Sequence, residues 1–317
     1  MNYNEPSIKK KREEVFSKKK RKQTTASAIV FRIVLILLCA VIVSGAGLLY
    51  GSFRGIIDSA PKDFSLAPKY SATIVYDDDN KQVQQLSDYS SNRIPVAYEQ
   101  IPDNLKNAFI SIEDERFYEH DGIDFKGILR ALWTDIRHGS TSQGASTLTQ
   151  QLIKNNVFEA GGETNIIAKV KRKIQEQYLA IIAEKKYNKE EILTNYLNTI
   201  NLGKGNLGVE AASKYYFGKS VNELTLSECA VLAGITKNPT FLNPVDYPED
   251  NDARRKLILK KMYQLNYISD TEYQSALEDK VYARIANKTA QGRKNSVYSY
   301  FTDAVITKVV SDLQEQK

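Results

Sequence analysis

The feature of this chain that most limits its fold is an uncharged apolar run from Ile33 to Tyr50. As a helix, these 18 residues would span about 27 Å, close to the hydrocarbon thickness of a bilayer. A cleaved signal peptide is the alternative, but the run is long for one and no small-residue cleavage site interrupts its far end. We therefore predict a transmembrane helix over residues 28–50 that remains as an anchor.

Basic residues before this run predict its orientation. Residues 1–27 contain nine lysines and arginines against three glutamates. Because positive flanks stay in the cytoplasm, we predict that residues 1–27 form a cytoplasmic tail and that everything after the helix is extracytoplasmic. The tail accounts for the whole formal net charge of +6. We therefore expect the tail to contact anionic lipids, and we expect no nucleic-acid binding.

The extracytoplasmic part is predicted to be one mainly α-helical domain with a small juxtamembrane β element. Residues 51–70 contain Gly, Ser and Pro and indicate a linker. Residues 71–86 alternate around a turn at 78–80, which predicts a hairpin. Helical periodicity is clearest over 167–184, 189–199 and 253–265. Three capping boxes predict helix starts, at Asn188 with Glu191, Thr225 with Glu228, and Ser269 with Glu272.

Cysteine and histidine usage excludes several classes of site. Cys39 lies in the predicted membrane helix and Cys229 lies far outside it, so we expect no disulfide. With His120 and His138 as the only histidines, a Cys/His metal site and a serine–histidine triad are poorly supported. We also expect no organic cofactor.

The stretch "IEDERFYEHDG" (112–122) is the first of three unusual polar segments. An apolar run over 108–112 leads directly into Glu113 and Asp114. A carboxyl group held beside apolar surface has a raised pKa, which suits proton transfer near neutral pH. Taken alone, however, the stretch favours a helix cap with solvated neighbours over a catalytic acid.

The second segment is "GASTLTQQLIKN" (144–155), in which a helix is predicted to start near Ser146. Thr147, Gln150, Gln151 and Lys154 then share one polar face. Neutral amides and hydroxyls suit hydrogen bonding to a polar ligand, and the free N–H groups of a helix start suit an anion. A buried amide network is the alternative.

The third segment, 168–184, places Glu176 with Arg172 and Lys173 on one helix face. Taken alone, this is an ordinary surface ion pair. Small residues at Ala180 and Ala183 continue the face, which predicts that it meets a crevice or another element. The opposite face is predicted to be the core stripe, formed by Ile167, Val170, Ile174, Tyr178 and Ile181.

Two glutamates in separate segments are typical of glycosidic chemistry, and cations beside them indicate a phosphate leaving group. The ordered motifs also resemble those of the peptidoglycan glycosyltransferases (glycosyltransferase family 51, penicillin-binding-protein type). The similarity covers residues 71–280, which we take as the glycosyltransferase domain. The motifs are Glu113-Asp114-x-x-Phe117-x-x-His120-x-Gly122, residues 144–151, Arg172-Lys173-x-x-Glu176, Lys189-x-x-Ile192-Leu193-x-x-Tyr196-Leu197-Asn198, and residues 208–244.

The resemblance implies a lysozyme-like helical fold and polymerisation of lipid II into β-1,4 glycan strands. The reaction would invert the anomeric carbon and release undecaprenyl pyrophosphate. Glu113 would be the general base, and Glu176 would act at the donor pyrophosphate, directly or through a divalent cation (Mg²⁺ or Mn²⁺). Lys154, Arg172 and Lys173 would bind that pyrophosphate. The implied substrate-binding set also includes Asp114, Phe117, His120, Ser146, Thr147, Gln150 and Gln151.

The resemblance further implies partners. These are the growing lipid-linked glycan strand, the membrane, other cell-wall synthesis proteins and phosphoglycolipid inhibitors of the moenomycin type. One departure from the family pattern is Ala168, where many members carry Arg. Either Lys169 replaces that cation or the hold on the pyrophosphate is weaker. Within the first motif, Glu115, Glu119 and Asp121 are expected to be solvated.

Residues 281–317 resemble the start of a linker toward a transpeptidase domain, as in class A bifunctional penicillin-binding proteins. No Lys-Thr-Gly is present, and Ser-x-x-Lys occurs only in the tail and the linker. We therefore expect the chain to be the glycosyltransferase part of a larger protein. A lytic glycan hydrolase and a non-catalytic membrane scaffold are the alternatives. The cation set argues against the first, and the two intact glutamates argue against the second.

Overall fold

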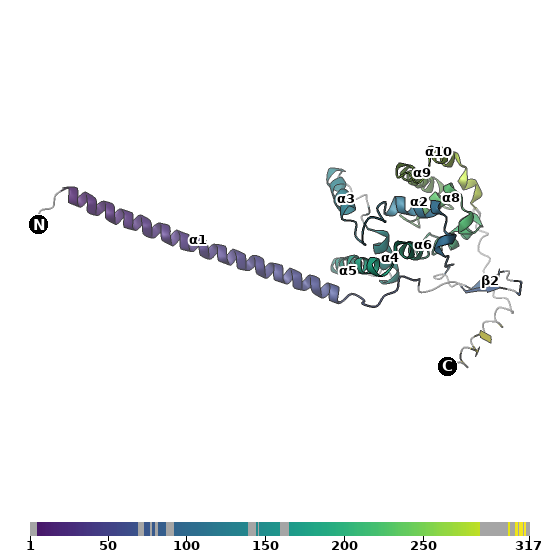
Figure 1. Ribbon diagram of the computed structural model, residues 1–317, viewed down its shortest axis with the longest axis horizontal. Coiled ribbons are helices and arrows are strands. Elements are labelled where there is room, and N and C mark those ends of the chain that lie inside the picture. The colour runs from purple at the N-terminus through teal and green to yellow at the C-terminus, as the bar shows by residue number, and fades with distance from the viewer. Residues whose placement is uncertain are drawn as a thin grey trace. The chain divides into compact units, whose positions relative to one another are not determined.

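The computed structural model describes residues 5–68, 73–76, 78–79, 82–86, 92–138, 144, 146–158 and 165–285, together with six positions between 304 and 314. It is mainly helical, which confirms the predicted fold class (Figure 1). Contacts divide it into two units, residues 1–60 and 61–317. The elements are α1 (Glu5–Asp58), β1 (Thr73–Tyr76), β2 (Gln82–Leu86), η1 (Tyr98–Gln100), α2 (Asp103–Glu113), α3 (Phe125–His138), α4 (Leu148–Asn156), α5 (Ile166–Lys186), α6 (Lys189–Leu197), α7 (Val209–Phe217), η2 (Val221–Glu223), α8 (Leu226–Ile235), α9 (Pro248–Gln264), α10 (Asp270–Glu278) and η3 (Val281–Arg284).

The first unit is the single helix α1. Its segment Val30–Asp58 is long and apolar enough to cross a membrane, judged by length and composition. Apolar side chains along it are exposed, for example Leu48 and Leu49 at 74% each. The unit therefore supplies no protein partner for this apolar surface, as expected of a helix that lies in lipid.

The segment predicted as a linker, 51–70, differs from that prediction in both of its halves. The helix α1 continues to Asp58. After it, Leu66 is fully buried in the second unit, and its carbonyl oxygen accepts a hydrogen bond from Asn156 Nδ2 at 2.6 Å. The composition of residues 51–70 is typical of a linker. Composition does not reveal that Leu66 fills a position in the core of the second unit.

The predicted hairpin is confirmed. The strands β1 and β2 pair antiparallel, with Thr73 opposite Leu86 and an irregularity in register between Val75 and Tyr76. Residues 78–79 form the turn, whereas residue 80 lies outside the described residues.

The core of the second unit is built around α8, in which every residue from Ser227 to Ile235 is buried. This helix packs against α2 and α9, while α4 packs against α5 and α6, so the helices form two groups (Figure 1). Glu113 ends α2, and its carboxylate is hydrogen-bonded to Gln151 of α4. The candidate site therefore lies where the two groups of helices meet.

All three predicted capping boxes are present. In each, the side chain of the cap residue accepts from the N–H three residues later, and the glutamate there accepts from the N–H of the cap residue. The pairs are Asn188 with Glu191, Thr225 with Glu228, and Ser269 with Glu272.

The helix α5 buries a different face from the one predicted. Ile167 and Val170 of the expected core stripe are 75% and 53% exposed. The buried face instead contains Glu176, Ala180 and Ala183. The expectation that this small-residue face meets another element is confirmed, because the backbone at Gly122 lies directly against it. Close backbone approach, rather than side-chain size, decided which face packs.

The folded unit extends beyond residue 280, the predicted end of the domain. Val281 is fully buried, and the Tyr282 hydroxyl donates to Asn251 Oδ1 at 2.6 Å. Arg284 Nε donates to Glu228 Oε1 at 2.9 Å. Most of the predicted linker toward a further domain lies outside the described residues.

Candidate functional site

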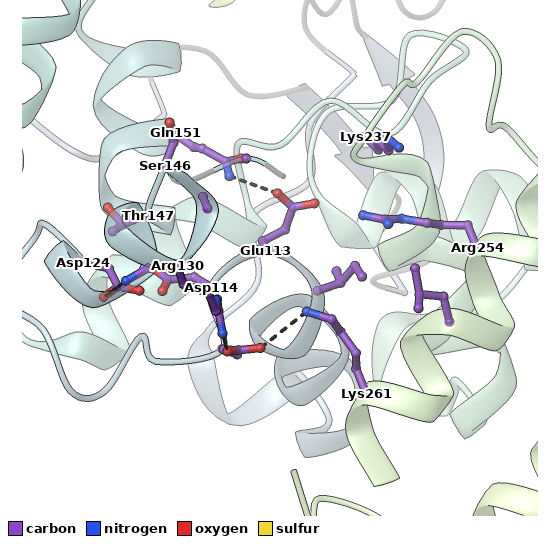
Figure 2. Close-up of a pocket in the computed structure, with 16 residues that line it drawn as sticks. Glu113, Asp114, Asp124, Arg130, Ser146, Thr147, Gln151, Lys237, Arg254 and Lys261 are labelled. Atoms are coloured by element: carbon purple, nitrogen blue, oxygen red, sulfur yellow. Dashed lines mark hydrogen bonds and ion pairs between the residues drawn. The ribbon is translucent and has the colours of Figure 1, made fainter. Parts of the chain in front are cut away.

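Glu113 is held by three segments of the chain. Its Oε2 accepts a hydrogen bond from Gln151 Nε2 at 2.9 Å, and its Oε1 accepts from Thr236 Oγ1 at 2.5 Å. Thr236 caps the end of α8, and its hydroxyl also lies 2.9 Å from the Ala233 carbonyl oxygen. Figure 2 shows Gln151 and Arg254 approaching Glu113 from opposite sides. The carboxylate is therefore positioned by neutral donors and faces a cation.

Tyr196 sets the orientation of the Gln151 amide. Its hydroxyl donates to Gln151 Oε1 at 3.3 Å. Burial raises the pKa of Tyr196 well above its usual range, and the charges of Glu113 and Asp114 raise it further. The phenol therefore stays protonated, and a glutamine that accepts from it must turn its NH₂ toward Glu113. Tyr196 belongs to the fourth motif, but its role was not predictable from the sequence.

Asp114 and His120 connect the first motif to α4. The Asp114 carboxylate accepts from the backbone N–H of Leu148 and contacts His120 Nε2, each at 3.0 Å. His120 Nδ1 accepts from the Gly122 N–H at 3.2 Å, so Nε2 carries the ring proton and donates it to Asp114. Both side chains are buried. The pair fixes the loop that follows Glu113.

Several residues that were predicted to bind substrate make contacts with this loop. Thr147 caps α4, and its hydroxyl donates to the Gly122 carbonyl oxygen at 2.8 Å. Gln150 Nε2 donates to the same oxygen at 3.3 Å. Phe117 is fully buried under the Lys189 ammonium, which lies 4.5 Å from the ring centroid. Phe117 and His120 line neither of the pockets described below.

The Glu113 pocket is a cavity of about 450 Å³. Among the described residues, four cations line it, and none of them was predicted from sequence: Arg130, Lys237, Arg254 and Lys261. Burial lowers the pKa of Arg254, and the charge of Glu113 opposes that shift. Within the described part of the chain, Arg254 Nε is buried without a hydrogen-bond partner. Four carboxylates line the same cavity (Glu113, Asp114, Glu115 and Asp124), so its cations can bind an anionic ligand only where a carboxylate does not already occupy them.

The Glu176 pocket is a larger cavity of about 970 Å³. It brings together Ser146, Gln150, Gln151, Lys154, Arg172, Lys173 and Glu176, all of which were predicted as site residues. Arg93 also lines it and was not predicted from sequence. Arg93 lies outside all of the motifs. An isolated β-bridge pairs its backbone with that of Leu207, which lines the same pocket.

The Glu176 carboxylate is buried between two cations. Its side chain is 2% exposed, Arg172 Nη1 donates to Oε1, and Lys173 Nζ lies 3.4 Å from Oε2. Lys173 also donates to Ser146 Oγ at 2.7 Å. Lys154 adds a further positive charge to the wall. Arg172, Lys173 and Lys154 together outnumber the single carboxylate of Glu176. The pocket therefore keeps a net positive charge, which suits a diphosphate.

Metal binding by the protein alone is not supported by these side chains. Among the described residues, no group of three or more His, Cys, Asp or Glu side chains could hold a metal ion. Both oxygens of Glu176 already face cations. The residues present therefore do not fit a resident metal ion.

The two pockets adjoin each other, because Ser146 and Gln151 line both. The shared wall places Glu113 and Glu176 in neighbouring cavities. Gln151 lies on the shared wall and is hydrogen-bonded to Glu113.

Comparisons with known proteins identify the family. The sequence profile described as Transglycosylase matches residues 79–263. Penicillin-binding protein 1A of Clostridium tetani is 41% identical over 291 residues, which cover 87% of this chain and 35% of that protein. The Clostridium acetobutylicum protein of the same name is 43% identical over 251 residues, which cover 76% and 31%.

A crystal structure of penicillin-binding protein 1A from Haemophilus influenzae is 28% identical, covers 67% of this chain and 21% of that chain, and has a TM-score of 0.38. The chain spans about a third of the length of the curated relatives it matches. The profile match includes both glutamates and all the cations named above, and the chain belongs to the transglycosylase family.

Proposed function

We propose that the chain is a peptidoglycan glycosyltransferase that polymerises lipid II into β-1,4 glycan strands. The observation that carries this proposal is the pair of adjoining pockets, one with Glu113 and the other with Glu176, each beside a set of cations. Joining two lipid-diphosphate substrates requires two neighbouring anion-binding pockets, so that the sugars of the two bound substrates meet. A hydrolase that cuts finished strands has no need for either set of cations.

In the proposed reaction, the Glu176 pocket holds the donor diphosphate. The 4-hydroxyl oxygen of the acceptor sugar forms a bond to the donor's anomeric carbon from the opposite face, so the configuration inverts. The hydroxyl proton passes to Glu113, and the bond from the anomeric carbon to the diphosphate oxygen breaks. Lys154, Arg172 and Lys173 stabilise the negative charge that develops on the departing undecaprenyl pyrophosphate. A divalent cation would arrive bound to this diphosphate.

The Glu113 pocket would hold the acceptor. Arg254 points toward Glu113, and Lys237, Arg130 and Lys261 line the same cavity (Figure 2). We infer that these cations bind the acceptor's diphosphate, which brings its sugar to the general base. Moenomycin-type phosphoglycolipids are expected to compete for the cations of the Glu176 pocket.

An exposed apolar stripe on α3 supports action at a membrane. Phe125, Leu129 and Trp133 are spaced four residues apart, so they share one helix face, and they are 68%, 66% and 68% exposed. Aligned large apolar side chains of this kind mark an interaction surface. We infer that the stripe contacts the outer leaflet, where both substrates keep their lipid tails. The anchor α1 and its basic flank agree with a cytoplasmic N-terminus and an extracytoplasmic catalytic part.

The test is polymerisation of fluorescent lipid II by the full chain in detergent, with Arg172→Gln beside the wild type. We expect glycan ladders from the wild type and a rate lower by about 100-fold in the variant, because the departing diphosphate loses a charged donor. Lys171→Gln is the matched control, since Lys171 is the preceding residue, is exposed and does not line the pocket.

Other outcomes would reject parts of the proposal. Cleavage of finished strands without polymerisation would identify a hydrolase. Neither activity from well-folded protein would indicate a scaffold. Normal rates from Arg172→Gln would mean that the donor pocket is misassigned.

A second prediction concerns Gln151. Tyr196→Phe removes the hydroxyl that orients this amide, so we expect about a fivefold lower polymerisation rate, which corresponds to about 1 kcal/mol for one hydrogen bond. Tyr216→Phe is the control, because it also removes a buried hydroxyl, bonded to the Leu202 carbonyl oxygen at 2.8 Å, but lies away from both pockets. Similar losses of rate in the two variants would show that general destabilisation, not amide orientation, is responsible.

A further inference from the structure

Glu115 links two cations of the Glu113 pocket. Its Oε1 accepts from Arg130 Nη1, and its Oε2 lies 3.4 Å from Lys261 Nζ. Arg130 belongs to α3 and Lys261 to α9, so one carboxylate joins two helices that are distant in sequence. From the sequence, Glu115 is predicted to be solvated. That prediction is wrong, because the side chain is 22% exposed and paired on both oxygens.

The other carboxylates of the pocket have different partners. Glu113 accepts from two uncharged side chains, and Asp114 binds the buried loop through His120. Asp124 pairs with Arg116, which does not line the pocket. Among the described residues, the cations of this pocket that form ion pairs are Arg130 and Lys261, and both pair with Glu115.

We propose that Glu115 is an internal counter-anion of the acceptor pocket, which holds Arg130 and Lys261 until a substrate diphosphate displaces it. This role rests on the proposed function, since it names the acceptor's diphosphate as the competing ligand. In the empty pocket, the carboxylate keeps two long cationic side chains close together and neutralises part of their repulsion. In the filled pocket, the diphosphate takes over both cations.

The exchange is physically reasonable because the pairs are weak and the competitor is strong. Arg130 and Lys261 are 49% and 33% exposed, and ion pairs this open contribute little. A diphosphate carries more charge and accepts paired hydrogen bonds from a guanidinium. Burial raises the pKa of Glu115, but Arg130 and Lys261 lower it by more, so the group is charged at neutral pH. It therefore opposes an incoming anion until it moves away.

The first experiment is calorimetric titration of the detergent-solubilised full chain with inorganic pyrophosphate. Glu115→Gln removes the competing charge and keeps the side chain's shape. We expect the Kd of this variant for pyrophosphate to fall about tenfold. This is the effect expected when one repelling unit charge is removed a few ångströms from the ligand in a partly exposed site. The gain should shrink in high salt. Glu119→Gln is the control, because it makes the same change at an exposed position of the same loop and should leave the Kd unchanged.

A second variant locates the effect. Pyrophosphate also fits the Glu176 pocket, so the titration alone does not say which pocket responds. If Glu115 competes for Lys261, then Glu115→Gln should give little gain in a Lys261→Gln background. Kinetics supply a further readout, since Glu115→Gln should lower the KM for lipid II. A side chain that only maintains the fold would not lower KM.

The outcomes separate this inference from the proposed function. Unchanged or weaker pyrophosphate binding by a Glu115→Gln protein that melts like the wild type would overturn the counter-anion role. If the wild type nevertheless polymerises lipid II, the proposed function is retained and only the counter-anion role is rejected. If the wild type does not polymerise lipid II but Glu115→Gln binds pyrophosphate more tightly, the proposed function fails and the counter-anion role stands. If Glu115→Gln tightens pyrophosphate binding as much in the Lys261→Gln background as in the wild type, the counter-anion role is also rejected.

Discussion

Glu113→Gln is expected to abolish glycan polymerisation, with a rate at least about 100-fold below the wild type. An amide cannot take the proton of the acceptor hydroxyl, so the attacking oxygen would have to carry it into the transition state. The fold should be unaffected, because glutamine has the same shape and keeps an oxygen for the Gln151 amide. The measurement is the lipid II polymerisation rate of the two proteins, with a melting curve of each.

Glu119→Gln serves as the control here as well, because Glu119 is exposed and lies outside both pockets. Its rate and melting temperature should match those of the wild type. Glycan ladders of normal length and yield from Glu113→Gln would show that another group is the general base.

Gly122→Ala is expected to cause the largest loss of stability, about 3 kcal/mol. Gly122 has a φ of +91°, and an added Cβ would lie 2.6 Å from the backbone carbon and oxygen of Ala180. These are backbone atoms of α5, which cannot move aside as the end of a flexible side chain could. The melting temperature should fall by about 10 °C, as followed by circular dichroism of the detergent-solubilised chain.

Gly144→Ala is the matched substitution, since a Cβ at Gly144 meets nothing within 4 Å. It should leave the melting temperature within about 1 °C of the wild type. Equal melting temperatures for Gly122→Ala and the wild type would mean that the loop can move away from α5 without cost.

Local features of the fold were predictable from sequence because their causes are local. A capping box is completed by two residues three positions apart, as at Asn188 and Glu191. The hairpin needs only two short extended runs and a turn. Glu176 was found with Arg172 and Lys173 because one helical turn places all three together.

Features that depend on contacts between distant segments were not predictable in this way. On α5, periodicity separated the two faces correctly, but the larger residues were taken for the buried set. The loop at Gly122 instead requires the small residues on the opposite face. The cations of the Glu113 pocket come from α3, from the segment after α8 and from α9. In sequence, each of them is indistinguishable from an ordinary surface lysine or arginine.

The hydroxyl of Thr236 has one proton but lies within hydrogen-bonding distance of two acceptors, the Glu113 carboxylate and the Ala233 carbonyl oxygen. A hydroxyl can rotate its single proton from one acceptor to the other without moving its oxygen. In the proposed reaction Glu113 becomes a neutral acid, and Thr236 can then turn its proton toward Ala233 and accept the new acid proton on its own oxygen. The same set of atoms then satisfies the base both before and after proton transfer, and the site needs no rearrangement of its backbone between the two states.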